Sequence, residues 1–216
     1  MNKINTIIFD LDGTLLDTLD DLSNSVNYAL NKCNMPERSQ KEIRSFLGNG
    51  IANLMRHSVP TGTKEEDFEH AFQTFRNHYV DHCLDLTKPY EGIMPLLHNL
   101  KEKGIKMAIV SNKLHPAVQE LNNRFFKEYI ASAVGESATV RRKPNPDAVI
   151  AALKELDSKK DVALYVGDSE VDLATARNAD MACVCVTWGF RDKEELLKLQ
   201  PDFLIDKPMD LLKIIE

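Results

Sequence analysis

Two aspartates, Asp10 and Asp12, follow an apolar run near the start of the chain, in the stretch TIIFDLDGTLLD at residues 6–17. Side chains two positions apart on a β-strand point to the same side, so the two carboxylates would lie together if the strand continued. Carboxylates this close repel each other and resist ionisation unless a positive charge compensates them. The simpler interpretation is a turn at Gly13, because Asp-Gly is a common turn sequence. Polar residues elsewhere in the chain decide between the two interpretations.

Three further groups of polar residues follow apolar runs later in the chain. They are Ser111-Asn112-Lys113, Lys143 within RRKPNPD, and Asp168 with Asp172 within GDSEVD. If a helix begins near Ser169 or Glu170, Asp172 lies in its first turn, where the helix dipole favours a carboxylate. Pro144 requires Lys143 to be extended, which constrains where its ammonium group points.

The elements that must position these residues alternate between strands and helices. Short apolar, β-branched runs predict strands at 5–10, 106–112, 131–136, 162–169, 182–188 and 202–205, and helical segments are expected at 92–103, 114–128, 145–157, 170–179, 192–200 and 208–215. This alternation predicts an α/β fold with a doubly wound, mostly parallel sheet that helices cover on both faces.

Residues 17–87 break this alternation and predict an all-helical domain inserted after the first strand. Two stripes of apolar residues at helical spacing indicate helices that pack on each other. The stripes are Leu22, Val26, Ala29, Leu30 and Cys33, and Phe68, Ala71, Phe72, Phe75, Tyr79 and Cys83. We therefore expect an α/β domain formed by residues 1–16 and 88–216, interrupted by a helical domain at 17–87.

The predicted sheet brings the polar groups together, because open parallel sheets bind ligands at the carboxyl ends of their strands. Asp10, Asp12, Asp168 and Asp172 would then converge with Ser111 and Lys143. Four carboxylates in one place would destabilise the fold by mutual repulsion and desolvation. A hard divalent cation with oxygen ligands removes this problem, and Mg²⁺ suits a few carboxylates together with a substrate phosphate.

This ordered set of motifs resembles the haloacid dehalogenase-like superfamily over nearly the whole chain. DLDGT at 10–14 is similar to the first family motif, Ser111 to the second, Lys143 to the third and GDSEVD at 167–172 to the fourth. The helical insertion resembles the family's C1 cap. The resemblance implies a Rossmann-like core and a phosphate-transferring enzyme, and Asp12 argues for phosphate chemistry rather than dehalogenation.

The resemblance also implies a role for each motif residue. Asp10 would be the nucleophile that forms an aspartyl-phosphate, and Asp12 the general acid and then the general base. Asp10, the backbone carbonyl of Asp12, and Asp168 would hold Mg²⁺, while Asp172 would orient these ligands. Ser111, the backbone amide of Asn112 and Lys143 would bind the phosphoryl oxygens.

Within the superfamily the chain is most similar to the phosphoglycolate phosphatase group, which implies phosphoglycolate as the first candidate substrate. The similar stretches are FLGNGIANLM at 46–55, RRKPNPDAV at 141–149 and VTWGFR at 186–191. Gly48, Asn49 and Gly50 could approach a small anionic substrate through their amides, or could simply form a turn between helices. β-Phosphoglucomutase, pyrophosphatase and nucleotidase activities stay open, although the segment after the first motif lacks the His expected of the mutase.

Two further alternatives belong to other classes of site or protein. A non-enzymatic, receiver-like phosphate-binding module would gather similar residues around Mg²⁺, but it would need neither Asp12 nor an inserted domain of about seventy residues. His78 and His82 have the i, i+4 spacing of a zinc-binding pair, but zinc sites usually need three or four ligands and no third is evident.

Composition limits the partners. A net charge of −6 and no long apolar run argue against nucleic acid and membrane as partners. The cysteines, Cys33, Cys83, Cys183 and Cys185, have no metal-binding or disulfide spacing and indicate reduced thiols in a cytoplasmic protein. We expect a partner that is a small phosphorylated metabolite, and a protein that is either a monomer or a homodimer.

Overall fold

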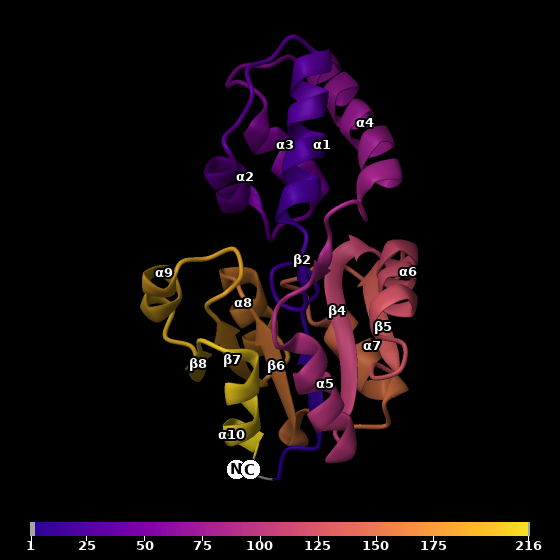
Figure 1. Ribbon diagram of the computed structural model, residues 1–216, viewed down its shortest axis with the longest axis vertical. Coiled ribbons are helices and arrows are strands. Elements are labelled where there is room, and N and C mark those ends of the chain that lie inside the picture. Colours follow the sequence, from indigo (N-terminus) through magenta and orange to yellow (C-terminus); the bar gives the residue numbers. More distant parts are fainter. Residues whose placement is uncertain (1–2, 216) are drawn as a thin grey trace. The chain divides into compact units, whose positions relative to one another are not determined.

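The computed structural model describes residues 3–215 and places six parallel strands in one sheet (Figure 1). In spatial order the strands are β5 (Ser132–Glu136), β4 (Lys106–Leu114), β1 (Thr6–Phe9), β6 (Ala163–Gly167), β7 (Ala182–Val186) and β8 (Phe203–Ile205). Every neighbouring pair is parallel. The predicted α/β fold with a parallel sheet is confirmed.

Helices follow the strands in the predicted order. They are α5 (Ile93–Glu102), α6 (His115–Phe125), α7 (Asp147–Glu155), α8 (Glu170–Asn178), α9 (Lys193–Lys198) and α10 (Leu211–Ile215), with short 3₁₀ turns at Lys160–Val162 and Pro208–Asp210. Figure 1 shows α5 and α10 in front of the sheet, whereas Val149 of α7 and Leu173 of α8 pack with Ile8 and Tyr165 on the other face. Strands buried on both faces explain the nearly continuous apolar runs that predicted them.

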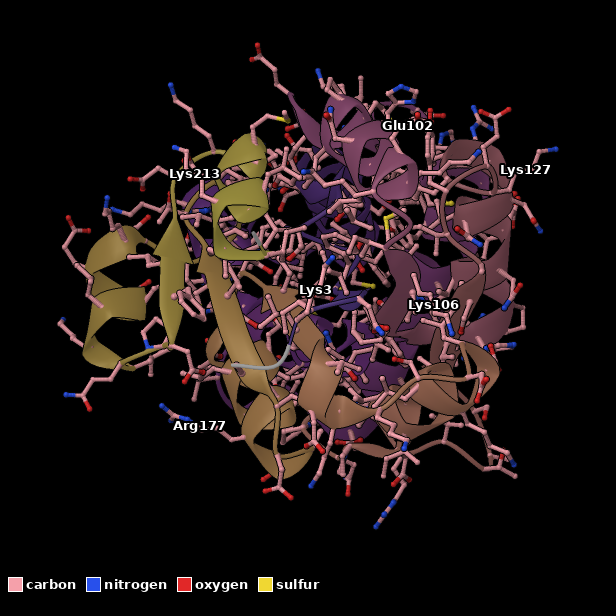
Figure 2. All side chains as sticks on the ribbon, turned by 90° about the horizontal axis from the view of Figure 1, so that it is seen from below. Lys3, Glu102, Lys106, Lys127, Arg177 and Lys213 are labelled. Carbon is pink, nitrogen blue, oxygen red and sulfur yellow. The ribbon has the colours of Figure 1, made fainter. Side chains whose placement is uncertain are left out.

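Two basic side chains labelled in Figure 2 bind the carboxyl ends of helices. Lys106 Nζ donates to the backbone oxygens of Leu156 and Asp157, just after α7, at 2.7 and 2.8 Å. Arg177 donates to the backbone oxygens of Leu199 and Gln200, just after α9. Cations at these positions satisfy carbonyls that have no partner within the helix.

The chain divides into two compact units, one extending to Leu15 and resuming at Pro89, the other comprising Leu16–Lys88. The second unit contains α1 (Leu19–Lys32), α2 (Gln40–Phe46), α3 (Ile51–Ser58) and α4 (Glu65–His82). The short strand β2 (Leu16–Asp17) pairs with β3 (Lys88–Pro89) where the chain enters and leaves this helical unit.

The helical unit has its own core, in which α1 packs on α4. Leu22, Val26, Ala29 and Leu30 of the first predicted stripe are buried, as are Phe68, Ala71 and Phe75 of the second. Cys33, Phe72, Tyr79 and Cys83 are only partly buried. Within residues 3–215, no helix combines the length and apolar character needed to cross a membrane.

Candidate active site

The sheet places three of the predicted motifs on adjacent strands. β1 lies at the centre, with β4 on one side and β6 on the other, so the direction of strand connection reverses at β1. Asp10 follows β1 and Asp168 follows β6, whereas residues 111–113 form the end of β4, where the pairing with β5 shifts in register. Such irregularities redirect side chains at the end of a strand. The switch point therefore collects the polar residues that the sequence singled out.

Asp10 and Asp12 are each paired with a lysine. β1 ends at Phe9, and Asp10 Oδ1 then accepts hydrogen bonds from the Leu11 amide and from Lys143 Nζ, both at 2.7 Å. Asp12 Oδ1 lies 3.2 Å from Lys113 Nζ. The positive charge that the close carboxylates required is thus supplied by two separate side chains.

Asn112 holds the backbone of Lys143. Its side-chain oxygen accepts a hydrogen bond from the Lys143 amide at 2.6 Å, and its side-chain nitrogen donates to the Lys143 carbonyl at 3.3 Å. The Lys143–Pro144 peptide bond is cis. Lys143 Nζ then reaches both Asp10 Oδ1 and Asp172 Oδ1, each at 2.7 Å, with a side chain only 3% exposed. The amide side chain of Asn112 therefore has a positioning role that the sequence did not predict.

Asp172 lies in the first turn of α8, as predicted, and both of its oxygens are held by donors. Oδ2 accepts from the Ser169 hydroxyl at 2.6 Å, the Ser169 amide at 3.1 Å and the Asp168 amide at 3.3 Å. Oδ1 accepts from Lys143 Nζ and from the Tyr165 hydroxyl at 3.0 Å. A fully buried carboxylate with five donors fixes its neighbours and has no surface left for substrate.

Asp168 lies against the turn that follows Asp12. A Cβ atom on Gly13, whose φ is +83°, would lie 2.5 Å from Asp168 Oδ2, so only glycine fits there. The amide of Phe190 donates to the same oxygen at 2.6 Å. The neighbour that requires glycine at position 13 is therefore the carboxylate of Asp168.

Burial makes ionisation of these carboxyls unfavourable. Desolvation, followed by the repulsion of Asp172, raises the pKa of Asp10 well above its usual range and outweighs the attraction of Lys143. The same two causes, in the same order, raise the pKa of Asp168 to about 7. For Lys143, burial lowers the pKa, but Asp10 and Asp172 together raise it above its ordinary value. The Lys143 ammonium group therefore stays charged, whereas the carboxyls of Asp10 and Asp168 tend to hold protons.

This donor set fits a hard divalent cation. Within residues 3–215, Asp10, Asp168 and Asp172 form the one group of three or more His, Cys, Asp or Glu side chains whose ligand atoms lie within 4.8 Å of one another. Oxygen ligands are those that such cations prefer, and a cation would stabilise the ionised carboxylates. Asp172 is already occupied by its five donors, so Asp10 and Asp168 are the side chains suited to direct contact with a metal.

The remaining predicted residues lie in two places. Ser111 is buried at the same strand edge, and its hydroxyl accepts a hydrogen bond from the Lys113 amide at 3.2 Å. Gly48, Asn49 and Gly50 belong to the helical unit, where Gly50, with φ of 79°, directly precedes α3. This conformation explains the glycine without reference to a ligand.

Lys113, Tyr165 and Phe190 are among the participants in the site that were not assigned a role from the sequence. Tyr165 had a detectable signal, because a hydroxyl-bearing side chain inside the apolar strand ALYVG needs a buried hydrogen-bond partner. Lys113 directly follows the predicted Asn112 but carries no motif of its own. Phe190 acts through its backbone amide, which any residue except proline possesses.

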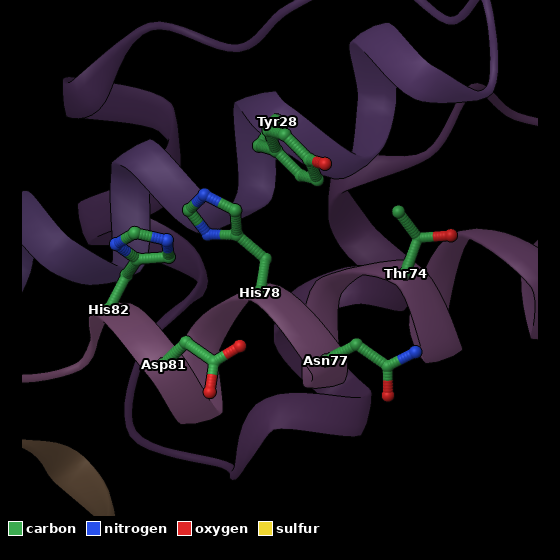
Figure 3. A pocket seen from close by; sticks show the side chains of 6 residues that line it. All are labelled: Tyr28, Thr74, Asn77, His78, Asp81 and His82. Carbon is green, nitrogen blue, oxygen red and sulfur yellow. The ribbon is translucent and has the colours of Figure 1, made fainter.

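The histidine pair lies in a separate pocket of about 320 Å³ in the helical unit (Figure 3). The rings of Tyr28 and His78 stack at 4.0 Å, and those of His78 and His82 at 4.2 Å. Burial, and next the neighbouring His82, lower the pKa of His78. The pair does not belong to a group of three closely spaced ligand atoms within residues 3–215, so this geometry does not favour zinc.

Comparison with known proteins gives one consistent family. The family model for haloacid dehalogenase-like hydrolases matches residues 7–186. A phosphoglycolate phosphatase from Aquifex aeolicus is 31% identical over 97% of this chain and 96% of its own. Pyrophosphatase PpaX from Bacillus cereus is also 31% identical, over 99% of this chain and 97% of its own.

Solved structures agree with this family. The crystal structure of a proposed phosphoglycolate phosphatase from Lactobacillus delbrueckii subsp. bulgaricus superposes with a TM-score of 0.94 at 33% identity. That alignment covers 99% of this chain and 98% of the other. Because the alignment covers nearly the whole chain, the structural similarity includes both units.

Proposed function

The chain belongs to the haloacid dehalogenase-like hydrolases, and we propose that it is a Mg²⁺-dependent phosphatase in which Asp10 receives the phosphoryl group. The observation that supports this most directly is the gradient of exposure within the acidic cluster. The side chains of Asp12 and Asp10 are 20% and 10% exposed, whereas that of Asp172 is fully buried. A substrate can therefore reach the two carboxylates that the chemistry requires.

Each carboxylate has a distinct step in the proposed reaction. An oxygen of Asp10 attacks phosphorus, the bond from phosphorus to the leaving oxygen breaks, and Asp12 gives that oxygen a proton. Asp12 then takes a proton from water, whose oxygen attacks phosphorus and breaks the bond to Asp10. Inorganic phosphate and free Asp10 result, so the second step restores the enzyme.

The surrounding residues hold the phosphoryl group during both steps. Ser111, the Asn112 amide and Lys143 are proposed to bind its oxygens, where positive charge and N–H donors offset the charge that develops. Asp10, the Asp12 carbonyl and Asp168 would hold the cation, and Asp172 would keep Lys143 and Ser169 in place. When bound, a divalent ion there neutralises carboxylate charge and polarises the phosphoryl oxygens.

We propose phosphoglycolate as the substrate, with pyrophosphate as the second candidate. Relatives with each of these names are 31% identical to this chain over nearly its full length. The residues that would distinguish them are proposed to lie in the helical unit as a cap, with Gly48, Asn49 and Gly50 at the substrate. The cytoplasmic location expected from the cysteine pattern remains a prediction.

The test is phosphate release from a panel of esters with Mg²⁺: phosphoglycolate, pyrophosphate, nucleoside monophosphates and β-glucose 1-phosphate. We expect the highest kcat/KM with phosphoglycolate, and no activity in excess chelator. Conversion of β-glucose 1-phosphate to an isomer without phosphate release would instead identify a mutase. Absence of turnover with every ester would contradict an enzymatic function and favour a phosphate-binding module.

A further inference from the structure

The loop at residues 187–191, which follows β7, contacts the buried side chain of Asp168. Hydrogen bonds from Thr187, Trp188, Phe190 and Arg191 join the loop to other segments of the same unit. These bonds join Thr187 Oγ1 to Asp206 at 2.8 Å, Trp188 Nε1 to the Thr14 carbonyl at 3.0 Å, the Phe190 amide to Asp168 Oδ2 at 2.6 Å, and the Arg191 guanidinium to both oxygens of Glu170 at 2.7 and 2.9 Å. The loop is thus fixed along its whole length.

Gly189 brings the loop into direct contact with Asp168. A Cβ atom there would lie 2.3 Å from Asp168 Cβ and 2.3 Å from the Gly13 carbonyl oxygen. A Cβ atom on Gly13 would lie 2.5 Å from Oδ2 of the same carboxylate. Two glycines therefore enclose one carboxylate that is 1% exposed, and a displacement of either loop would change its orientation.

Trp188 connects the two loops that enclose Asp168. Its indole N–H donates to the carbonyl of Thr14, the residue that follows Gly13, across 174 positions of sequence. Thr14 also directs its hydroxyl toward Asp168 Oδ1, at 3.4 Å. The indole bond therefore joins a segment that contacts Oδ1 to a segment whose Phe190 amide binds Oδ2.

We propose that the loop at 187–191 sets the orientation of the Asp168 carboxylate for metal binding, and that Trp188 is a positioning residue that holds the loop in place. The inference rests on the proposed function, because it assumes that Asp168 binds a divalent cation. A metal ligand held by neighbouring donors binds more tightly than one free to rotate, since less orientation is lost on binding. Loss of the indole N–H should therefore weaken metal binding.

The test compares full-length wild-type protein with Trp188→Phe, which keeps an aromatic ring and removes the donor. Thermal unfolding is followed at increasing MgCl₂, because a ligand that binds only the folded state raises the unfolding temperature by an amount that gives its dissociation constant. We expect the Mg²⁺ dissociation constant to rise by about two- to tenfold, as for loss of one neutral hydrogen bond.

Gln119→Met is the matched control. Gln119 Nε2 donates to the Ala133 carbonyl at 2.6 Å, a bond of the same type in the same unit between α6 and β5. Its loss should lower the unfolding temperature and leave the Mg²⁺ dissociation constant unchanged. A merely structural Trp188 would behave in the same way as this control.

A second measurement does not depend on folding of the variant. Trp188 is the only tryptophan of the chain, so selectively excited tryptophan fluorescence reports on this loop alone. We expect Mg²⁺ to shift the emission of the wild type at the concentrations that stabilise it, and Asp168→Asn to abolish the shift.

An unchanged Mg²⁺ dissociation constant in folded Trp188→Phe would overturn the proposal. The proposal would also be overturned if saturating Mg²⁺ stabilised the wild type without shifting its tryptophan emission. If Trp188→Phe does not fold, the fluorescence titration decides alone. A wild type that Mg²⁺ does not stabilise at all would instead contradict the metal site of the proposed function, and the inference with it.

Discussion

At the residue scale, the site depends on how each carboxylate is compensated. Asp10 has Lys143 at 2.7 Å and Asp12 has Lys113 at 3.2 Å, so the two neighbours in sequence have different cationic partners. The sequence predicted convergence of Asp10, Ser111, Lys143, Asp168 and Asp172, because parallel strands end at one edge. It did not predict Lys113 as a partner, since the direction of a lysine at a bulge depends on the local backbone.

Asp10→Asn separates the chemical role of this residue from its structural role. We expect turnover to fall by at least about a thousandfold, because an amide oxygen is a poor nucleophile toward phosphorus. Burial and the repulsion of Asp172 raise the pKa of Asp10, so a neutral amide should leave the metal-free protein as stable as the wild type or more so. Phosphate release measures the turnover of Asp10→Asn, and thermal unfolding of the same preparation measures its stability. Appreciable residual turnover would refute the assignment of Asp10 as the nucleophile.

The raised pKa of Asp168 predicts how stability and metal binding depend on pH. The unfolded chain loses this proton near the ordinary value of 3.8, whereas the folded protein keeps it to about 7. Between these values the folded metal-free protein binds more protons than the unfolded chain, so this group's contribution to stability falls as the pH rises. Mg²⁺ needs the ionised form, and its dissociation constant should rise by at least about tenfold per unit as the pH falls below about 7.

Thermal unfolding with and without Mg²⁺, from about pH 5.5 to about pH 8, measures this dependence. Asp168→Asn serves as the control, because it removes the titrating group. Equal Mg²⁺ affinity of the wild type at both ends of this range would count against the assignment of Asp168 as a ligand.

At the element scale, the start of α8 determines the geometry of the site. The sequence predicted a helix near Ser169 or Glu170 with Asp172 in its first turn, and the structure begins α8 at Glu170. What the sequence did not show is that Oδ1 of Asp172 binds Tyr165 of the preceding strand and Lys143, which lies 29 positions earlier in the chain. Tertiary contacts of this kind have no local signal.

Asp172→Asn should be strongly destabilising despite its small change in shape. Both carboxylate oxygens accept hydrogen bonds from donors, so the amide nitrogen would face a donor in either orientation. Leaving Lys143 with one fewer buried negative partner adds to the cost, and we expect a loss of about 3 kcal/mol. Urea unfolding measures it.

Asp192→Asn is the comparison for this substitution, because Asp192 caps the start of α9 at the surface, whereas Asp172 is the buried third residue of α8. Asparagine and aspartate are nearly equivalent at such positions, so we expect a change below about 0.5 kcal/mol. Equal losses of stability for the two variants would show that the donors around Asp172 do not cause the destabilisation of Asp172→Asn.

At the scale of the whole molecule, one chain forms two units with separate cores, and the sequence indicated both from a change of periodicity. The predicted limits of the insertion, 17 and 87, lie one residue inside the limits of the helical unit. The side-chain pattern could not show the short pairing of β2 with β3, because two-residue strands are too short to produce an alternation.

If the helical unit selects the substrate, Gly50→Ala should change the ratio of kcat/KM for phosphoglycolate to that for pyrophosphate. Gly50 has φ of 79° and directly precedes α3. Gly62→Ala is the matched control, since Gly62 has φ of +85° in open space within the same unit. Both variants should lose about 1 kcal/mol of stability from backbone strain. A ratio that stays constant in Gly50→Ala would contradict a role for this loop in selectivity.

The most direct test of the central claim is capture of the phosphoryl group on Asp10. The substrate is whichever of phosphoglycolate and pyrophosphate the wild type hydrolyses faster, and it is radiolabelled in the group that is transferred. The wild type is mixed with Mg²⁺ and this substrate, and the reaction is quenched with acid during a single turnover. We predict label on the peptide that contains Asp10, and none in Asp10→Asn. Two results would contradict this claim. One is a wild type that releases labelled phosphate with no label on that peptide at any time, and the other is Asp10→Asn that releases labelled phosphate at the wild-type rate.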